Sequence, residues 1–490
     1  NIDARNTEGG VSPTLKFDTC TNFRVYGSGV IENGYREAMY FTSCSNFDVD
    51  INSIGTGIND NLTGIYIRYC NDFYFSGGCA NAITKKLTTG YNDWSNAFQI
   101  WDSYRFVING MTIQNNGMNG IYSALNCHDF AISNNNIYSN GGSGIQIAWT
   151  GDTSAEKYPY RFTINNNIIT YNRADSIDCN NTHPSGIQDA FAIITDNQCA
   201  YNGWTNSDPS GGTPTSDGAG VTLVNLYNVI VSNNSVYENS RAGIYANNCQ
   251  DILVDGNIIY KSLTGTTGEA LYLEAVSRGR WVNNRVYYAN AGQAVKLYGA
   301  VVDVIIENNY LTGTWVNPTP SGSVSYTRVI AAHNTISTSA TIAAYYDFIE
   351  NTISSTVDGA IIDIGSNINA VRNKIYSTIA SSSVTGINSS GTANSVIEGN
   401  YIVCSGAGAS GIKLTSVAQP KIVNNYSESK GKCINIDSCS QFVLTGNRSN
   451  NTGTDNSFYV TGSTNGIKFA NVAAAGATSY GSAGQYDINY

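Results

Sequence analysis

Charged side chains are scarce in this sequence of 490 residues. Asp, Glu, Lys and Arg together make up 13% of it, about half of the roughly 25% that is usual in globular domains. Acidic residues outnumber basic ones, and the formal net charge is −10. Nucleic-acid binding requires clustered Lys and Arg that displace counterions from phosphates. The charge therefore argues against a nucleic-acid partner and is easier to reconcile with a neutral or weakly acidic glycan.

Long apolar runs are also missing. No window approaches 18 consecutive apolar residues, and no charged-then-apolar leader opens the chain, so we expect neither a membrane span nor a signal peptide. The first residue is not Met, which favours a mature or trimmed form. Only three His are present, far apart, and no Cys and His spacing resembles a zinc site. We expect no metal and no cofactor.

The eleven cysteines do not read as a disulfide framework, because their number is odd and six share one context. Each of the six stands three residues before a Phe or Ile: Cys20, Cys44, Cys70, Cys127, Cys249 and Cys439. Such a column places small apolar side chains inside the fold, which is the ordinary location of free Cys. We expect reduced thiols and folding in a cytoplasm.

Asparagine recurs at nearly even intervals along the second half of the chain. Nine intervals cover 213 residues, about 24 each, and the shortest, from Asn334 to Asn351, is 17. The ten positions are Asn234, Asn257, Asn284, Asn309, Asn334, Asn351, Asn373, Asn400, Asn425 and Asn447. A fixed period of this length indicates a solenoid, in which the amides of successive coils can bond to one another across ~4.8 Å. The alternative is that Asn only favours left-handed turns.

Each repeat contains two or three short apolar alternations bounded by Gly, Asn or Asp, and none has a helical period. Such repeats predict an all-β parallel β-helix solenoid of roughly 16 coils. We expect one domain over residues 1–470 and a C-terminal tail over 471–490, because a solenoid can lengthen without enlarging a single core.

Four insertions interrupt the first half, at residues 80–96, 150–160, 180–189 and 203–218. Alignment of the coils on their first strand predicts inward residues at Ile65, Phe98, Ile121, Ile145, Ile177 and Val221. The residues that follow them should form one outer file that points to solvent: Tyr66, Gln99, Tyr122, Gln146, Asp178 and Thr222. The insertions would then wall a trough along this file. Function is expected there, because inserted loops carry function more often than regular scaffold.

Carboxylates in the trough are the candidate catalytic groups. Asp175 and Asp178 lie on its floor, and Asp152 and Glu156 lie in a wall loop. Glycoside cleavage needs one protonated and one ionised carboxyl. We assign Asp178 as base or nucleophile and Glu156 as acid, with Asp175 as the first substitute. An Asp at these positions can also simply cap a turn.

Substrate binding is assigned to polar and aromatic side chains of the same segment, because flat rings with a polar edge suit sugars. The assigned residues, besides Asp152, are Gln99, Trp101, Gln146, Trp149, His183, Trp94 and Trp204. The tryptophans could instead cover the insertions as small local cores.

The runner-up chemistry is β-elimination on a uronic acid polymer, with His183 as base and Lys85, Lys86 or Lys157 as the neutralising cation. A non-catalytic glycan-binding adhesin is the alternative from another class.

The chain resembles right-handed parallel β-helix proteins such as pectate lyases, NosD-like proteins and bacteriophage tailspikes. The resemblance rests on Asn-rich repeats such as Ile-Ser-Asn-Asn-Asn-Ile-Tyr at 132–138 and Ile-Asn-Asn-Asn-Ile-Ile at 164–169. No segment matches the calcium-binding Asp and Arg cluster of pectate lyases. Among these relatives, tailspike depolymerases fit best. That resemblance implies a homotrimer in the phage tail that binds and hydrolyses the capsular polysaccharide or O-antigen of a host bacterium with paired carboxylates.

Overall fold

The computed structural model describes residues 13–31, 37–54, 63–81, 95–148, 158–181, 186–205, 213–215, 217–261, 269–288, 293–316, 326–342, 346–355, 358–381, 383–463, 465–475, 478–480 and 486–488. These ranges consist of parallel strands and turns without a helix. They therefore include no helix of the length and apolar content needed to cross a membrane. The all-β solenoid expected from the repeats is confirmed, and the chain divides into two compact units, residues 1–272 and 273–490.

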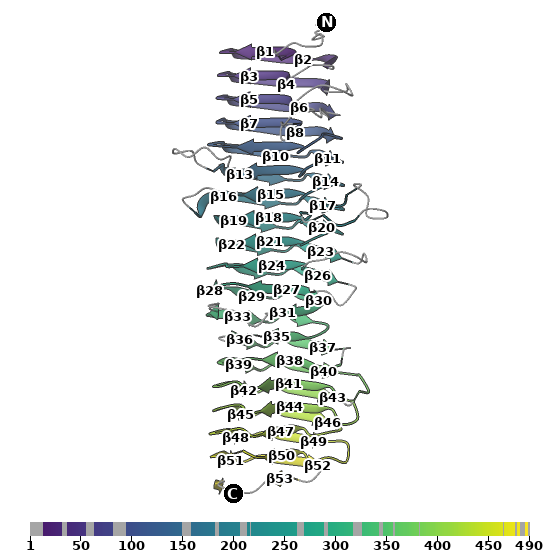
Figure 1. The fold of residues 1–490 in the computed structure, drawn as a ribbon, viewed down its shortest axis with the longest axis vertical. Helices are drawn as coiled ribbons and strands as arrows, with labels where there is room; N and C mark the ends of the chain where they lie inside the picture. The colour runs from purple at the N-terminus through teal and green to yellow at the C-terminus, as the bar shows by residue number, and fades with distance from the viewer. Residues whose placement is uncertain are drawn as a thin grey trace. The chain divides into compact units, whose positions relative to one another are not determined.

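In the first unit, each coil has a first strand in one sheet and a second and third strand in another, and equivalent strands of successive coils pair in parallel (Figure 1). The first strands are β1 (Leu15–Asp18), β3 (Glu37–Thr42), β5 (Thr63–Arg68), β7 (Phe98–Trp101), β9 (Ile121–Ala124), β12 (Ile145–Ala148), β15 (Ile177–Asn180), β18 (Val221–Val224) and β21 (Ile244–Asn247). The second strands, the first four of which are long enough to bend into the third position, are β2 (Thr21–Ile31), β4 (Ser45–Ile54), β6 (Asn71–Asn81), β8 (Tyr104–Gln114), β10 (His128–Ser133), β13 (Tyr160–Asn165), β16 (Gln188–Thr195), β19 (Leu226–Ser232) and β22 (Gln250–Asp255). The third strands are β11 (Asn136–Tyr138), β14 (Ile168–Thr170), β17 (Gln198–Ala200), β20 (Ser235–Tyr237) and β23 (Ile258–Lys261).

The second unit repeats this plan, and the division between the units falls inside β24 (Leu271–Glu274). Its first strands are β27 (Gln293–Tyr298), β31 (Thr314–Val316), β35 (Ala340–Ile342), β38 (Ala360–Ile364), β41 (Thr385–Ser390), β44 (Ser410–Thr415), β47 (Ile434–Asp437), β50 (Phe458–Thr461) and β53 (Thr478–Tyr480). Its second strands are β25 (Arg280–Val282), β29 (Ile305–Glu307), β33 (Val329–Ala332), β36 (Tyr346–Ile349), β39 (Ile368–Val371), β42 (Val396–Glu398), β45 (Lys421–Val423), β48 (Val443–Thr445), β51 (Ile467–Phe469) and β54 (Tyr486–Ile488). Its third strands are β26 (Arg285–Tyr288), β30 (Tyr310–Thr312), β34 (Thr335–Ile336), β37 (Thr352–Ser355), β40 (Lys374–Ser377), β43 (Tyr401–Cys404), β46 (Tyr426–Ser429), β49 (Arg448–Asn451) and β52 (Val472–Ala475). A small extra pair is formed by β28 (Val301–Val302) and β32 (Tyr326–Thr327).

The segment expected to be a tail contributes strands to the coils. Strands β52, β53 and β54 pair in parallel with β49, β50 and β51. The repeat therefore continues past residue 470. The segment after residue 470 is rich in Gly and Ala and lacks the alternating apolar pattern that predicts the other strands.

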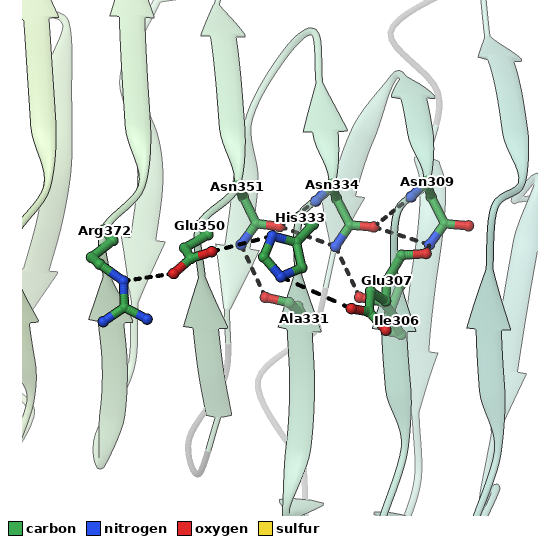
Figure 2. A network of polar contacts seen from close by, with 9 residues as sticks. All are labelled: Ile306, Glu307, Asn309, Ala331, His333, Asn334, Glu350, Asn351 and Arg372. Atoms are coloured by element: carbon green, nitrogen blue, oxygen red, sulfur yellow. Dashed lines mark hydrogen bonds and ion pairs between the residues drawn. The ribbon is translucent and has the colours of Figure 1, made fainter.

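The asparagine column forms a buried hydrogen-bonded ladder. In the second unit, each ladder amide donates to the next at 2.9–3.1 Å, from Asn284 through Asn447 and on to Asn471. The short interval keeps the register, because Asn334 Nδ2 donates to Asn351 Oδ1 at 3.0 Å. Figure 2 shows these amides in line, with a second row of His333, Glu350 and Arg372 beside them.

The left-handed backbone of this turn lies at the residue before each ladder asparagine. His333, Glu350 and Arg372 have φ between 51° and 55°, whereas Asn334, Asn351 and Asn373 are not among the residues with positive φ. The ladder, rather than a preference for left-handed turns, therefore explains the column.

A second ladder in the first unit was not anticipated. It joins Asn116, Asn140, Asn172, Asn202 and Asn239 at 2.7–3.0 Å at the turn after the third strand. The first ladder also begins earlier than expected, at Asn135, and runs through Asn167 and Asn197 to Asn234. Two buried amide columns thus fix the coil register on either side of the third strands.

Apolar side chains stack in columns inside the first unit. Phe47, Phe73, Phe106, Phe130 and Phe162 lie face to face with ring centroids 4.6–5.1 Å apart. The ten cysteines whose side chains are described are all free, and all except Cys20 are buried. None of these ten forms a disulfide bond in the structure, in line with the expectation.

Candidate functional site

The predicted outer file is present with the predicted register. Gln99, Tyr122, Gln146, Asp178 and Thr222 are direct partners across the first strands β7, β9, β12, β15 and β18. Tyr66 precedes them on β5 and Tyr245 follows them on β21. Residues more than a hundred positions apart are therefore brought into one line on one face of the sheet.

The solvent exposure expected for this file is wrong at three positions. Gln99 has no exposed surface, and Asp178 and Thr222 are 7% and 8% exposed. Side chains at the start of the first strands and in the turns before them cover the file, as in the bond from Thr63 Oγ1, in β5, to Gln99 Oε1 at 3.2 Å. Tyr66, Tyr122 and Gln146 remain partly exposed, so the floor is a mainly buried polar line with openings.

Asp178 lies at the end of a relay of amides. Asn119 Oδ1 accepts a bond from the backbone N–H of Ser143 at 2.7 Å, and its Nδ2 donates to Gln146 Oε1 at 2.8 Å. Gln146 Nε2 in turn donates to Asp178 Oδ2 at 2.8 Å. The backbone donor fixes the orientation of both amides, since an amide oxygen cannot donate. Oδ2 of Asp178 is therefore the accepting atom, and Oδ1 is left to carry a proton.

That remaining oxygen is buried and makes no hydrogen bond with the described residues. A buried oxygen without a partner favours the neutral carboxyl over the carboxylate.

Asp175 is the second carboxyl of the site, in the turn that precedes β15. It is 7% exposed, and its Oδ1 accepts the backbone N–H of Ala219 at 2.5 Å. The hydroxyl of Thr222, from the next coil, also bonds to it. We refer to Asp175 and Asp178 as the carboxyl pair.

The surroundings of Asp175 and Asp178 give the two carboxyls different pKa values. Burial and, to a smaller extent, the negative charge of Asp175 raise the pKa of Asp178 to about 8, although the Gln146 bond acts in the opposite direction. Burial also raises the pKa of Asp175, to about 6, but the bonds from Ala219 and Thr222 oppose this rise. A proton in the pair is therefore favoured on Asp178, and the negative charge is favoured on Asp175, which accepts the Ala219 N–H. This is the division of roles that acid–base catalysis by two carboxyls requires.

The aromatic residues divide into exposed and buried groups. Trp101 is partly exposed on the face of Gln99, with its ring 5.6 Å from that of Tyr66 and under the guanidinium of Arg68. Tyr40 and Tyr66 stack at 5.0 Å on the same side. Trp204 differs from expectation: it is 2% exposed, and its Nε1 donates to the carbonyl of Glu238 at 3.2 Å. It packs as part of a local core, so its ring is not presented to a ligand.

Several predicted site residues lie outside the described residues, namely Trp94, Trp149, Asp152, Glu156 and His183, together with the cations Lys85, Lys86 and Lys157. Their roles stay predictions. Within the described ranges, no group of three His, Cys, Asp or Glu side chains is placed to hold a metal.

Sequence reasoning missed Asn119 and the bond from Thr222 to Asp175. The first stands three residues before Tyr122, as Asp175 stands three before Asp178. A polar residue three positions before an outer-file residue is thus a repeated sequence signal. This signal could have identified the side chains that cover the file.

Comparison with known proteins supports the architecture. Residues 152–311 match the family described as right handed beta helix region, which confirms the expected handedness for that part of the chain. No curated protein matches the sequence.

Solved structures with a similar fold share little sequence with this chain. The pre-mature bacteriophage phi29 gene product 12 has 12% identity and a TM-score of 0.45, covering 94% of this chain and 67% of its own. A double-mutant tailspike of E. coli bacteriophage HK620 in complex with a pentasaccharide has 11% identity and a TM-score of 0.42, covering 83% and 69%. The GH87 alpha-1,3-glucanase of Streptomyces thermodiastaticus strain HF3-3 has 10% identity and a TM-score of 0.27, covering 78% and 60%. This chain thus spans less than two thirds of the glucanase catalytic unit, and at such identities the similarity concerns the fold alone.

Proposed function

We propose that this protein is a tailspike-type depolymerase that hydrolyses glycosidic bonds of a bacterial surface polysaccharide. The observation that carries the proposal is the carboxyl pair, because Asp175 accepts a backbone N–H that favours its ionised form whereas Oδ1 of Asp178 is buried without a partner, which favours its neutral form. In this mechanism Asp178 protonates the leaving glycosidic oxygen through Oδ1, and Asp175 acts as base on the attacking water. These roles differ from the sequence-based assignment, which made Asp178 the base or nucleophile and Glu156 the acid, and the burial of Asp178 supports the change.

Aromatic side chains along the same sheet support a sugar polymer as the substrate. Tyr40 and Tyr66, both partly exposed, lie on one side of the carboxyl pair with ring centroids 5.0 Å apart, and the partly exposed Tyr272 lies on the other. Sugar rings pack on such faces. The net charge of −10 also suits a neutral or weakly acidic glycan better than a strong polyanion.

The proposed location and assembly of the protein depend on its resemblance to tailspikes. Location in a phage tail and assembly as a homotrimer follow from the similarity of the Asn-rich repeats to tailspikes. Buried free cysteines agree with folding in a reducing cytoplasm before release. Light scattering after size-exclusion chromatography measures the assembly, and a monomer at micromolar concentration contradicts the trimer.

Incubation with a panel of capsular polysaccharides and O-antigens, followed by sizing of the products, tests the activity. Loss of polymer length without a new ultraviolet absorbance supports hydrolysis. An unsaturated product that absorbs in the ultraviolet identifies elimination instead. Tight binding without shortening of any polymer on the panel supports the adhesin and contradicts the enzyme.

The carboxyl pair predicts a bell-shaped dependence of activity on pH, with limbs set by Asp175 near 6 and by Asp178 near 8. Gln146→Leu removes a bond that favours ionised Asp178, so the alkaline limb should move to higher pH. Thr222→Val removes a bond that favours ionised Asp175, so the acidic limb should move to higher pH. The profiles of kcat/KM for the two variants and the unmodified protein measure both shifts. Movement of the wrong limb in either variant contradicts the assignment of acid and base.

A further inference from the structure

A surface hollow in the second unit gathers a different set of ligand-binding groups. It lies on the outer face of β26 and β30 and is lined by Asn283, Arg285, Tyr287, Asn308 and Tyr310. Arg285 and Tyr310 are direct partners across the two strands, so their side chains leave the sheet in neighbouring positions. Asn283 and Asn308 occupy equivalent left-handed turn positions, each with φ of 57°. The hollow is therefore built by two successive coils in register.

Two aromatic rings form one side of the hollow. The centroids of Tyr287 and Tyr310 are 5.6 Å apart, and their planes meet at 48°. The tilted rings leave an open angle, as do Tyr376 and Tyr401 farther along, whose planes meet at 53°. Tyr310 is 40% exposed. A sugar ring can place its apolar C–H face on such rings and keep its hydroxyls at the rim.

The rim supplies an amide and a positive charge. Asn308 and Arg285 are exposed, and no acidic side chain of the described residues pairs with Arg285. Glu307, next to Asn308, is directed toward His333, with its Oε1 3.9 Å from His333 Nε2 (Figure 2). A guanidinium presents several donors in a fork that matches a carboxylate, and an amide can both donate to and accept from a hydroxyl.

We propose that this hollow binds a sugar that carries a carboxylate, such as a uronic acid, at a site separate from the carboxyl pair. Tyr287 and Tyr310 contact the ring, Asn308 bonds to a hydroxyl, and Arg285 pairs with the carboxylate. The inference depends on the hollow alone and stands whether or not the first unit cleaves a polymer.

Ligand-observed NMR titration of the full chain tests the site with two matched probes, trigalacturonate and its trimethyl ester, which removes only the charge. The titrations use the Asp178→Asn protein so that the proposed activity cannot consume a probe. Trigalacturonate should bind about tenfold more tightly than the ester, which corresponds to one charge-assisted contact. Arg285→Gln should abolish this preference while leaving binding of the ester unchanged. Tyr310→Ala should weaken both probes by a similar factor.

The same strand column provides matched controls. Arg448 and Tyr401 occupy positions equivalent to Arg285 and Tyr310 on later coils, outside the hollow. Tyr401 is 42% exposed, which is close to Tyr310. Arg448→Gln and Tyr401→Ala should leave both titrations unchanged. Equal binding of acid and ester, or an equal loss in control and hollow variants, overturns the proposal, and so does the absence of binding by either probe.

Discussion

Replacement of Asp178 by Asn is expected to lower the rate of polysaccharide depolymerisation at least about a thousandfold, within the range that removal of a general acid produces. The amide keeps the shape of the carboxyl, and its carbonyl oxygen can still accept the bond from Gln146. Product sizing over time measures the rate. A matched control is Asp363→Asn, on first strand β38 of the second unit, where Asn388 Nδ2 donates to Asp363 Oδ1 at 2.8 Å. Retained activity in the Asp178 variant removes this residue from the mechanism.

The same substitution gives an independent check on the state of Asp178. Its folded pKa is raised above the unfolded value near 3.8, so the folded state binds more protons between about pH 4 and pH 8. The contribution of Asp178 to the free energy of unfolding is therefore highest below pH 4, and it is lost as the pH rises to 8. The amide of the Asp178→Asn variant does not titrate, so the variant should melt at a higher temperature than the unmodified protein at pH 8, with a smaller gain at pH 5. If the variant and the unmodified protein melt at the same temperature at pH 8 and at pH 5, Asp178 is not a buried neutral carboxyl.

Loss of one ladder amide should have the largest effect on stability. Asn351 makes four buried bonds: Oδ1 accepts from the backbone N–H and Nδ2 of Asn334, and Nδ2 donates to Asn373 Oδ1 and the Ala331 carbonyl. Asn351→Ala leaves these partners buried without bonds, and each such group costs about 1–3 kcal/mol. We expect a loss of at least about 3 kcal/mol in the free energy of unfolding.

Chemical denaturation followed by circular dichroism measures this loss. The matched control is Asn369→Ala, which removes an exposed amide on neighbouring strand β39 that donates to Asp347 Oδ1 at 2.6 Å. Exposed substitutions of this kind change stability by about 0.5 kcal/mol or less. If both variants lose the same small amount, the ladder contributes no more than a surface bond.

The register of the candidate site could be predicted from the sequence. Strand alternation has a period of two, so the choice of Ile145 and Ile177 as inward residues fixes Gln146 and Asp178 on the opposite face. The Asn column was equally readable, because a buried amide must meet a partner at a fixed distance along the stack. Both inferences depend on spacing along the chain, which the sequence contains directly.

Only the tertiary structure decided the chemical state of those residues. The raised pKa of Asp178 depends on its burial and on the charge of Asp175, and the bond from Gln146, which belongs to another coil, opposes it. The burial of Trp204 depends on the Glu238 carbonyl, and the hollow at Arg285 and Tyr310 depends on the tilt of two rings on adjacent coils. Periodicity determines which residues share a face, but the exposure and pKa of a side chain depend on neighbours in other coils, whose side-chain positions the repeat does not specify.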